Sequence, residues 1–178
     1  RSFSRELAAL GVTSFTDASY TNTSADVEGF KEAFAKGDIC QRVMVMGDDS
    51  LAEGHLKVML DESDLPDVDA LADRIRAAHL RQRPVAFHCV SRVELLIALS
   101  ALDAAGCMVG DRIEHGAIIG EDMLNMLRNT GCTVVTQPGF IAQRGERYRR
   151  EVAATEHEDL YRYQTLLDAG IGVAASSD

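Results

Sequence analysis

Apolar and polar residues alternate with two different periods along this chain. Short apolar, β-prone runs are each followed by a segment with apolar residues at helical spacing. In the clearest unit, Val85-Ala86-Phe87-His88 precedes the capping box Ser91-Arg92-Val93-Glu94 and an apolar run over 95–102, and Arg112-Ile113-Glu114-His115-Gly116 follows. This pattern predicts strand, helix and strand, with a histidine at the end of each strand.

The rest of the chain repeats this alternation without hairpin signals. We expect seven strands, at 12–17, 40–46, 56–60, 85–88, 112–115, 133–137 and 172–178. We expect helices near 4–10, 24–36, 68–78, 91–102, 121–129 and 143–151, and one that a second capping box opens at Thr155-Glu156-His157-Glu158. Strands that alternate with helices form a parallel sheet with helices outside it.

The choice between an open sheet and a barrel depends on the strand ends. No glycine-rich phosphate loop follows a strand, and ionisable residues recur where strands end, which is typical of a (β/α)8 TIM-type barrel. Seven strands are one fewer than a closed barrel needs. We therefore predict an α/β fold, a partial (β/α) barrel that forms one catalytic domain over residues 1–178.

Composition narrows the class of protein. The 178 residues are 46% hydrophobic and 26% charged, enough to build one globular core. A net charge of -10 argues against nucleic-acid binding, which needs clustered Lys and Arg. No apolar run could span a membrane and no signal-peptide pattern is present, so we expect a cytoplasmic protein. The four cysteines lack metal-site spacing, and we expect reduced, partly buried thiols.

Four ionisable residues can converge at one rim of such a barrel. His88, His115 and Asp178 would offer two imidazoles and a carboxylate, a donor set that suits zinc. Lys57, on the strand at 56–60, would repel a cation unless burial lowers its pKa and its amine takes up carbon dioxide as a carbamate. A rim lysine paired with an acid of the next loop is an equally open interpretation of Lys57.

The ordered motifs resemble the amidohydrolase superfamily, and within it the N-substituted formamide deformylases and imidase-like hydrolases. These motifs are Leu-Lys-Val-Met-Leu-Asp with Lys57, Val-Ala-Phe-His with His88, Arg-Ile-Glu-His-Gly with His115, Gln137-Pro138, and Ala-Ser-Ser-Asp with Asp178. The resemblance implies metal ligands at His88 and His115, the eighth-strand acid at Asp178 and the carboxylated lysine at Lys57. The His-x-His pair of the family's first strand and its β-sandwich domain do not occur here, so we expect this chain to lack a full binuclear centre.

For the intact parent, the resemblance implies a metal-dependent hydrolase of carbon–nitrogen bonds in amides, formamides or cyclic amides, with one or two zinc-like ions. Asp178 would take a proton from the metal-activated water and pass it to the leaving nitrogen. The expected substrate is a small molecule with an amide-type bond. Four residues after the strand at 133–137 are candidates for substrate binding: Gln137, Phe140, Arg144 and Tyr148.

Two other functions stay open. A lysine inside a barrel can form a Schiff base, which would make Lys57 the nucleophile of a lyase, but this leaves the histidines and Asp178 without a shared purpose. Alternatively, the chain is not catalytic, and its open barrel edges pair with another copy to form a homo-oligomer.

Three local expectations accompany these hypotheses. Alternation within the strand turns Glu114 away from His115 towards the helices, where it would pair with Arg112. Alternation also turns Cys89 away from the side that His88 faces, into the core. The arginine-rich run at 144–150 is expected to be a solvated helix face.

Overall fold

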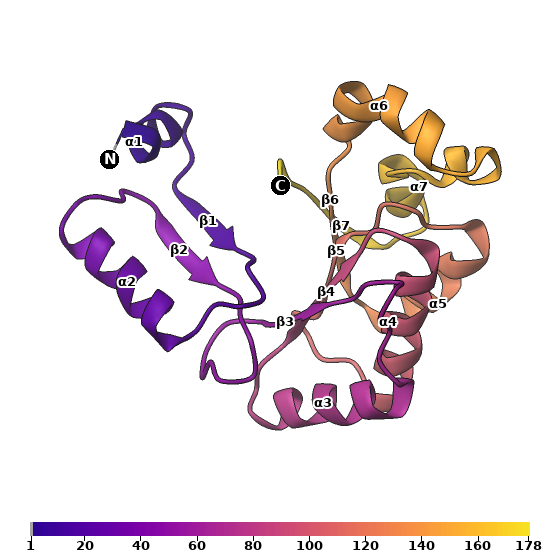
Figure 1. The fold of residues 1–178 in the computed structure, drawn as a ribbon, viewed down its shortest axis with the longest axis horizontal. Coiled ribbons are helices and arrows are strands. Elements are labelled where there is room, and N and C mark those ends of the chain that lie inside the picture. The colour runs from indigo at the N-terminus through magenta and orange to yellow at the C-terminus, as the bar shows by residue number, and fades with distance from the viewer. Residues whose placement is uncertain (1) are drawn as a thin grey trace. The chain divides into compact units, whose positions relative to one another are not determined.

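The computed structural model describes residues 2–178 as strands that alternate with helices (Figure 1). Contacts between residues divide the chain into two compact units, and the division falls within strand β3 (Leu56–Met59), after Val58. No helix of residues 2–178 is both long and apolar enough to cross a membrane.

The first unit is built on a parallel pair of short strands. Ser14 lies opposite Arg42, and Asp17 lies opposite Val45. Asn22 Nδ2 donates to Asp17 Oδ1 at 2.8 Å and to the Met46 carbonyl at 2.9 Å, which holds the ends of the two strands together. The elements of this unit before β3 are α1 (Ser2–Ala9), β1 (Ser14–Asp17), α2 (Ser24–Ala35) and β2 (Arg42–Val45).

The second unit carries the rest of a sheet whose strand order is β3-β4-β5-β6-β7. The pairs from β4 to β7 are parallel, which confirms the parallel sheet predicted from the sequence. Its elements after β3 are α3 (Val68–Leu80), β4 (Val85–Cys89), α4 (Arg92–Ala105), β5 (Arg112–His115), η1 (Glu121–Met123), α5 (Leu124–Thr130), β6 (Thr133–Thr136), α6 (Gly139–Glu151), η2 (Ala154–Asp159), α7 (Tyr163–Asp168) and β7 (Gly172–Ala175).

The core of the second unit lies between the sheet and the helices. Phe87, Ile113 and Val134 are matched in register and have no exposed surface, so they define one buried face. Leu95 and Leu102 of α4 are equally buried, and Figure 1 shows α4, α5 and α7 on one side of the strands. The buried apolar face of the parallel strands therefore meets a helix layer, as a (β/α) unit requires.

The predicted capping box at the start of α4 is confirmed. Ser91 Oγ accepts from Glu94 N at 3.2 Å, and Glu94 Oε2 accepts from Ser91 N at 3.0 Å. The same carboxylate oxygen accepts from Val90 N at 2.7 Å, so it also fixes the backbone shortly after His88. This cap thereby holds the turn that leaves the end of β4.

The second predicted capping box is wrong. The segment that contains Thr155 is the 3-10 helix η2, and no side chain caps it. An antiparallel bridge joins Ile118 to Leu160, and Tyr161 N donates to the Ala117 carbonyl at 2.8 Å. These long-range bonds hold residues 160–161 in a non-helical conformation, so the helix begins only at Tyr163.

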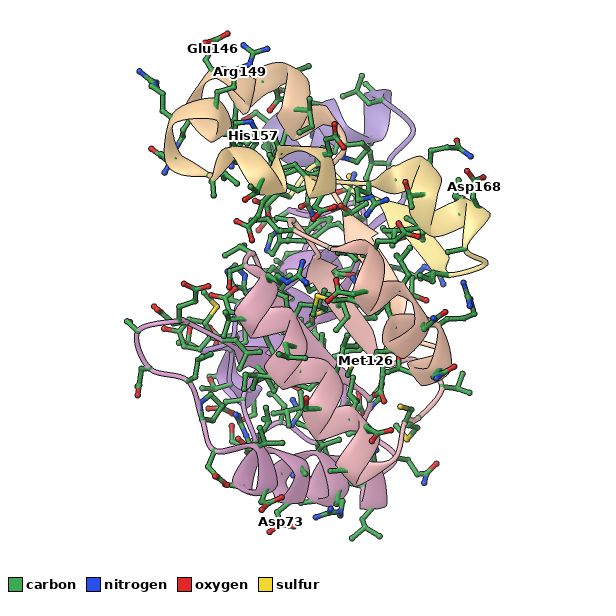
Figure 2. The ribbon with its side chains drawn as sticks, turned by 90° about the vertical axis from the view of Figure 1, so that its right-hand side faces the viewer. Asp73, Met126, Glu146, Arg149, His157 and Asp168 are labelled. Carbon is green, nitrogen blue, oxygen red and sulfur yellow. The ribbon has the colours of Figure 1, made fainter. Side chains whose placement is uncertain are left out.

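The arginine-rich run lies on α6 and faces solvent, as predicted. Arg144, Arg147, Arg149 and Arg150 are all exposed. Glu146 and Arg149 form an exposed ion pair, and both project outward from α6 in Figure 2.

The cysteines divide into two exposed and two buried thiols. Cys89 is fully buried, as predicted for a core residue, and Cys132 is also buried, whereas Cys40 and Cys107 are exposed. Burial raises the pKa of Cys132 to about 12, so this thiol stays protonated at neutral pH.

Candidate active site

Two histidines meet at the carboxyl ends of β4 and β5. The ring centroids of His88 and His115 lie 4.6 Å apart, and the ring planes cross at 76°. Both side chains are partly exposed. The expectation that these two residues are neighbours is therefore confirmed.

The backbone of His115 departs from strand geometry. Its register partner on β4 is Cys89, which by simple alternation would point it away from His88. A φ of 69° at His115 turns the side chain towards the His88 ring instead. Gly116 follows with a φ of 51°, and a Cβ there would lie 2.9 Å from Val134 Cγ1, so this turn requires glycine.

Gln137 contacts the His115 ring through its side-chain amide. The amide oxygen Oε1 lies 2.9 Å from Nδ1 of His115. The Gln137 amide nitrogen donates to Ser176 Oγ at 2.8 Å, which orients the amide group. Because an amide oxygen can only accept, Nδ1 carries the proton in this contact, and in the neutral ring Nε2 is then the acceptor nitrogen. His115 is thus prepared to act as a ligand or a base through Nε2.

The contact of Gln137 with substrate stays a prediction, and the structure shows a different set of contacts for this residue. Its side chain is 2% exposed and lies outside the cavity lining. Its amide is already bonded to His115 and Ser176, so we assign it to positioning His115.

Glu114 pairs with Arg112, as predicted, but its predicted direction is wrong. Arg112 Nε lies 2.8 Å from Glu114 Oε1, although neither atom makes an aligned hydrogen bond. Glu114 is the register partner of His88, and partners in a parallel ladder point to the same face. The ion pair therefore lies on the face that His88 shares, opposite the face of Phe87 and Ile113.

Asp178 lies at the same site. Ser176 N donates to the Thr136 carbonyl at 2.9 Å, which continues the pairing of β6 and β7 towards Asp178. Asp178 has a φ of 74° and lines one cavity together with His88 and His115. Three of the four predicted ligands thus line one cavity, although these three side chains are not placed to hold a metal ion together.

The cavity has a volume of about 270 Å³ and lies next to α6. Three of the predicted substrate-binding residues line it: Phe140, Arg144 and Tyr148. Arg144 places its guanidinium carbon 3.7 Å from the centre of the Phe140 ring. One wall of the cavity is therefore aromatic and carries a cation.

Tyr161 is a residue of this site that the sequence analysis missed. It is 7% exposed, its ring packs edge-on against Phe140, and its hydroxyl lies 3.1 Å from the Tyr148 hydroxyl. Burial, and then the hydrogen bond with Tyr148, raise the pKa of the Tyr161 phenol. The sequence placed it inside a helix, and the bridge that moves it is long-range, so no local signal could have identified it.

Backbone strain gathers at this cavity. Four non-glycine residues of the described part of the chain have a positive φ, namely Gln82, His115, Tyr161 and Asp178. The last three of these line the cavity. Strained backbone that persists at one site is typical of functional positions, because packing must hold it there.

Lys57 lies on β3, in the first unit. Its side chain is 5% exposed, and its backbone N–H donates to the Gly47 carbonyl at 2.8 Å. This burial excludes a position at the surface, whereas the pairing of Lys57 with an acid and its role as a metal ligand both stay predictions. Within residues 2–178, no group of three or more His, Cys, Asp or Glu side chains is placed to hold a metal ion. The two imidazoles fit a zinc-like ion, and a complete ligand set needs further donors.

The comparisons with solved structures identify the fold. A metal-dependent hydrolase from Pyrococcus furiosus superimposes with a TM-score of 0.82 and 19% identity over 99% of this chain and 45% of that chain. One from Pyrococcus horikoshii OT3 gives 0.79 and 19% over 98% and 43%, and the A. niger ochratoxinase gives 0.66 and 16% over 98% and 55%. No protein-family model matches the chain, and no curated protein matches its sequence.

These likenesses show a shared fold. The chain has the α/β fold of a partial (β/α) barrel, as the sequence analysis predicted, and this is the fold of the metal-dependent hydrolases named above. It spans 45% and 43% of the length of the two Pyrococcus proteins, which is less than half.

Proposed function

We propose that this chain is the barrel part of a metal-dependent hydrolase that cleaves carbon–nitrogen bonds of amides, formamides or cyclic amides with an activated water. The observation that carries the proposal is the pair of imidazoles, 4.6 Å apart, at a cavity that Asp178 also lines. The fold shared with metal-dependent hydrolases supports the same class. Because the chain spans less than half of those proteins, the activity is proposed for the whole protein.

His88 and His115 are the residues proposed to hold a divalent ion, and zinc suits their imidazole nitrogens. Gln137 supports this role because it fixes the tautomer in which Nε2 of His115 is a free acceptor. A bound ion of this kind lowers the pKa of water and polarises an amide carbonyl. Lys57 is proposed as a further ligand in carboxylated form only on the resemblance of its Leu-Lys-Val-Met-Leu-Asp motif to the amidohydrolase superfamily.

The other groups of the cavity are proposed to move a proton and to bind the carbonyl. Asp178 would accept the proton of the attacking water and return it to the leaving nitrogen. The phenol of Tyr161 keeps its proton at neutral pH because its pKa is raised, so it can donate a hydrogen bond to a carbonyl oxygen. Phe140, Arg144 and Tyr148 would contact the rest of the substrate.

Within this class, we propose the branch of N-substituted formamide deformylases and imidase-like hydrolases. The proposal rests on the Arg-Ile-Glu-His-Gly and Ala-Ser-Ser-Asp motifs, which hold His115 and Asp178. A cavity of about 270 Å³ suits a small-molecule substrate.

Metal content and turnover together test the proposal. The purified chain is supplied with zinc, freed of unbound metal and analysed for metal by mass spectrometry, and then offered N-formyl and N-acetyl amines. We expect bound zinc in the unaltered chain and at least about tenfold weaker binding in a His88→Ala, His115→Ala double variant.

His79→Ala is the matched control, because its Nε2 lies 3.1 Å from Asp111 at the other end of the sheet. This variant should retain zinc. Equal zinc binding by all three proteins would contradict the proposal, as would the absence of both zinc and turnover in the unaltered chain.

A further inference from the structure

Arg144 is an arginine of the cavity that has no carboxylate partner among the described residues. It lines the cavity, and within residues 2–178 it forms no ion pair with a carboxylate. Two other arginines of α6 do form ion pairs: Arg147 Nε pairs with Glu151 Oε2 at 2.6 Å, and Arg149 pairs with Glu146. Arg150 is also unpaired within the described part of the chain but does not line the cavity, so Arg144 is the arginine of α6 that offers an unpaired charge there.

The stacking of Arg144 on Phe140 determines which part of the guanidinium stays available. The guanidinium carbon lies 3.7 Å from the ring centre, so the flat face of the group is in contact with the aromatic ring. The N–H donors lie in the guanidinium plane and are not consumed by this contact. A planar fork of donors on a rigid support matches the two oxygens of a carboxylate.

The charged groups that line the cavity leave one positive charge without a partner in the part of the chain that the structure describes. Arg147 and Glu151 neutralise each other there, and Asp178 belongs with the histidines of the proposed metal site. Arg144 is then the cation that remains. Beside it, the rings of Phe140 and Tyr161 form an apolar wall, with ring centroids 5.8 Å apart.

We propose that the cavity takes amides whose non-reacting part carries a carboxylate next to an apolar group, and that Arg144 is the residue that determines this specificity. N-acylated derivatives of apolar amino acids are the chemical class that this combination fits. The proposal rests on the function proposed above, because it concerns the same site. It adds a requirement on the substrate, which must have a carboxylate on the part that does not react.

A pair of probes that differ only in charge tests the proposal. Binding of N-acetylphenylalanine and of N-acetylphenylalanine amide to the zinc-supplied chain is measured by titration calorimetry. We expect the acid to bind about tenfold more tightly than the neutral amide, as a charge-assisted pair would give. Arg144→Gln should reduce this preference to about one, without loss of folding because the side chain is exposed.

Arg150→Gln is the matched control. Arg150 lies on the same helix, is exposed, forms no ion pair within the described residues and does not line the cavity. This variant removes the same charge and should leave the preference for the acid intact. A preference that survives in Arg144→Gln, or falls equally in both variants, would overturn the proposal, as would equal binding of acid and amide by the unaltered chain.

Turnover separates this proposal from the proposed function. Preferential binding of the acid through Arg144 without hydrolysis would leave the anion subsite standing and count against the hydrolase. Hydrolysis of neutral amides that Arg144→Gln does not affect would support the hydrolase and overturn the subsite.

Discussion

The two ends of the sheet in the second unit use histidine and aspartate in opposite ways. At the amino end, Asp111 Oδ1 accepts from Val85 N at 2.9 Å and lies 3.1 Å from His79 Nε2, while Oδ2 accepts from Met108 N at 2.8 Å. At the carboxyl end, His88, His115 and Asp178 gather around a cavity. At the amino end the polar groups are hydrogen-bonded to other groups of the protein, whereas at the carboxyl end they line a cavity.

The difference shows how the same residue types are bonded within the protein at one end and remain accessible at the other. The Asp111 side chain is fully buried, and both of its oxygens are bonded to groups at the start of β4 and β5. At the carboxyl end, His115 and Tyr161 line the cavity with positive φ values of 69° and 48°, a conformation that costs a residue with a Cβ about 1–2 kcal/mol. In barrel enzymes the chemistry lies at this carboxyl end, which agrees with the contrast.

Removal of the Asp111 charge should have the largest effect on stability. In Asp111→Asn, one oxygen becomes a donor, so at least one buried N–H, of Val85 or of Met108, loses its acceptor. We expect the free energy of unfolding to fall by about 3 kcal/mol, measured by urea denaturation. Asp73→Asn is the control, because Asp73 is exposed on α3 and its ion pair with Arg76 is worth less than about 1 kcal/mol. Similar losses of unfolding free energy in Asp111→Asn and Asp73→Asn would contradict the stabilising role assigned to Asp111.

Much of the fold follows from local patterns. The strand-helix-strand unit around Ser91 was predicted correctly because a capping box, an apolar run and two β-prone runs all agree there. The segment at 155–161 was predicted wrongly because its capping box is a local signal. The bridge from Ile118 to Leu160, between residues far apart in sequence, decides the conformation instead.

The candidate site was predictable only in part. His88 and His115 could be identified because each ends a β-prone run, and their rings do meet. The left-handed turn at His115 could not be predicted, since alternation assumes regular strand geometry. The bond from Gln137 to His115 and the stacking of Arg144 on Phe140 depend on how elements pack, which no spacing encodes.

A methyl group at Gly116 should disturb the carboxyl end more than the same change at the amino end. Gly116 and Gly131 both have a positive φ, of 51° and 66°. An added Cβ at Gly116 would meet Val134 Cγ1 at 2.9 Å, whereas nothing lies within 4 Å at Gly131. We expect Gly116→Ala to lower the free energy of unfolding by about 2 kcal/mol and Gly131→Ala by about 1 kcal/mol. Equal losses would show that packing at Gly116 adds nothing to the turn.

Loss of the Gln137 amide should weaken metal binding rather than folding. In Gln137→Leu, His115 Nδ1 loses its acceptor, so the ring is free to change tautomer and to turn. We expect zinc affinity to fall by about tenfold or more, measured by competition with a chromogenic chelator. Nitrogen NMR shifts of the His115 ring should show loss of the Nδ1-protonated form, a change that a merely structural residue would not produce. Gln137→Glu retains an acceptor at that position and should preserve the tautomer, and unchanged ring shifts in the Leu variant would rule out the positioning role.

The smallest effect is expected where strain occurs away from the cavity. Gln82 has a φ of 56° and is exposed, and the hydrogen bond that its side chain donates to the His79 carbonyl is long at 3.5 Å. Gln82→Gly removes the steric cost of the left-handed conformation, about 1 kcal/mol. Part of this stabilisation is offset because glycine has more conformational entropy in the unfolded chain. We expect a net rise of about 0.5 kcal/mol in the free energy of unfolding, with zinc affinity unchanged. A fall in stability would show that left-handed backbone is not strained in this protein, and would remove strain from the reasons for assigning function to His115, Tyr161 and Asp178.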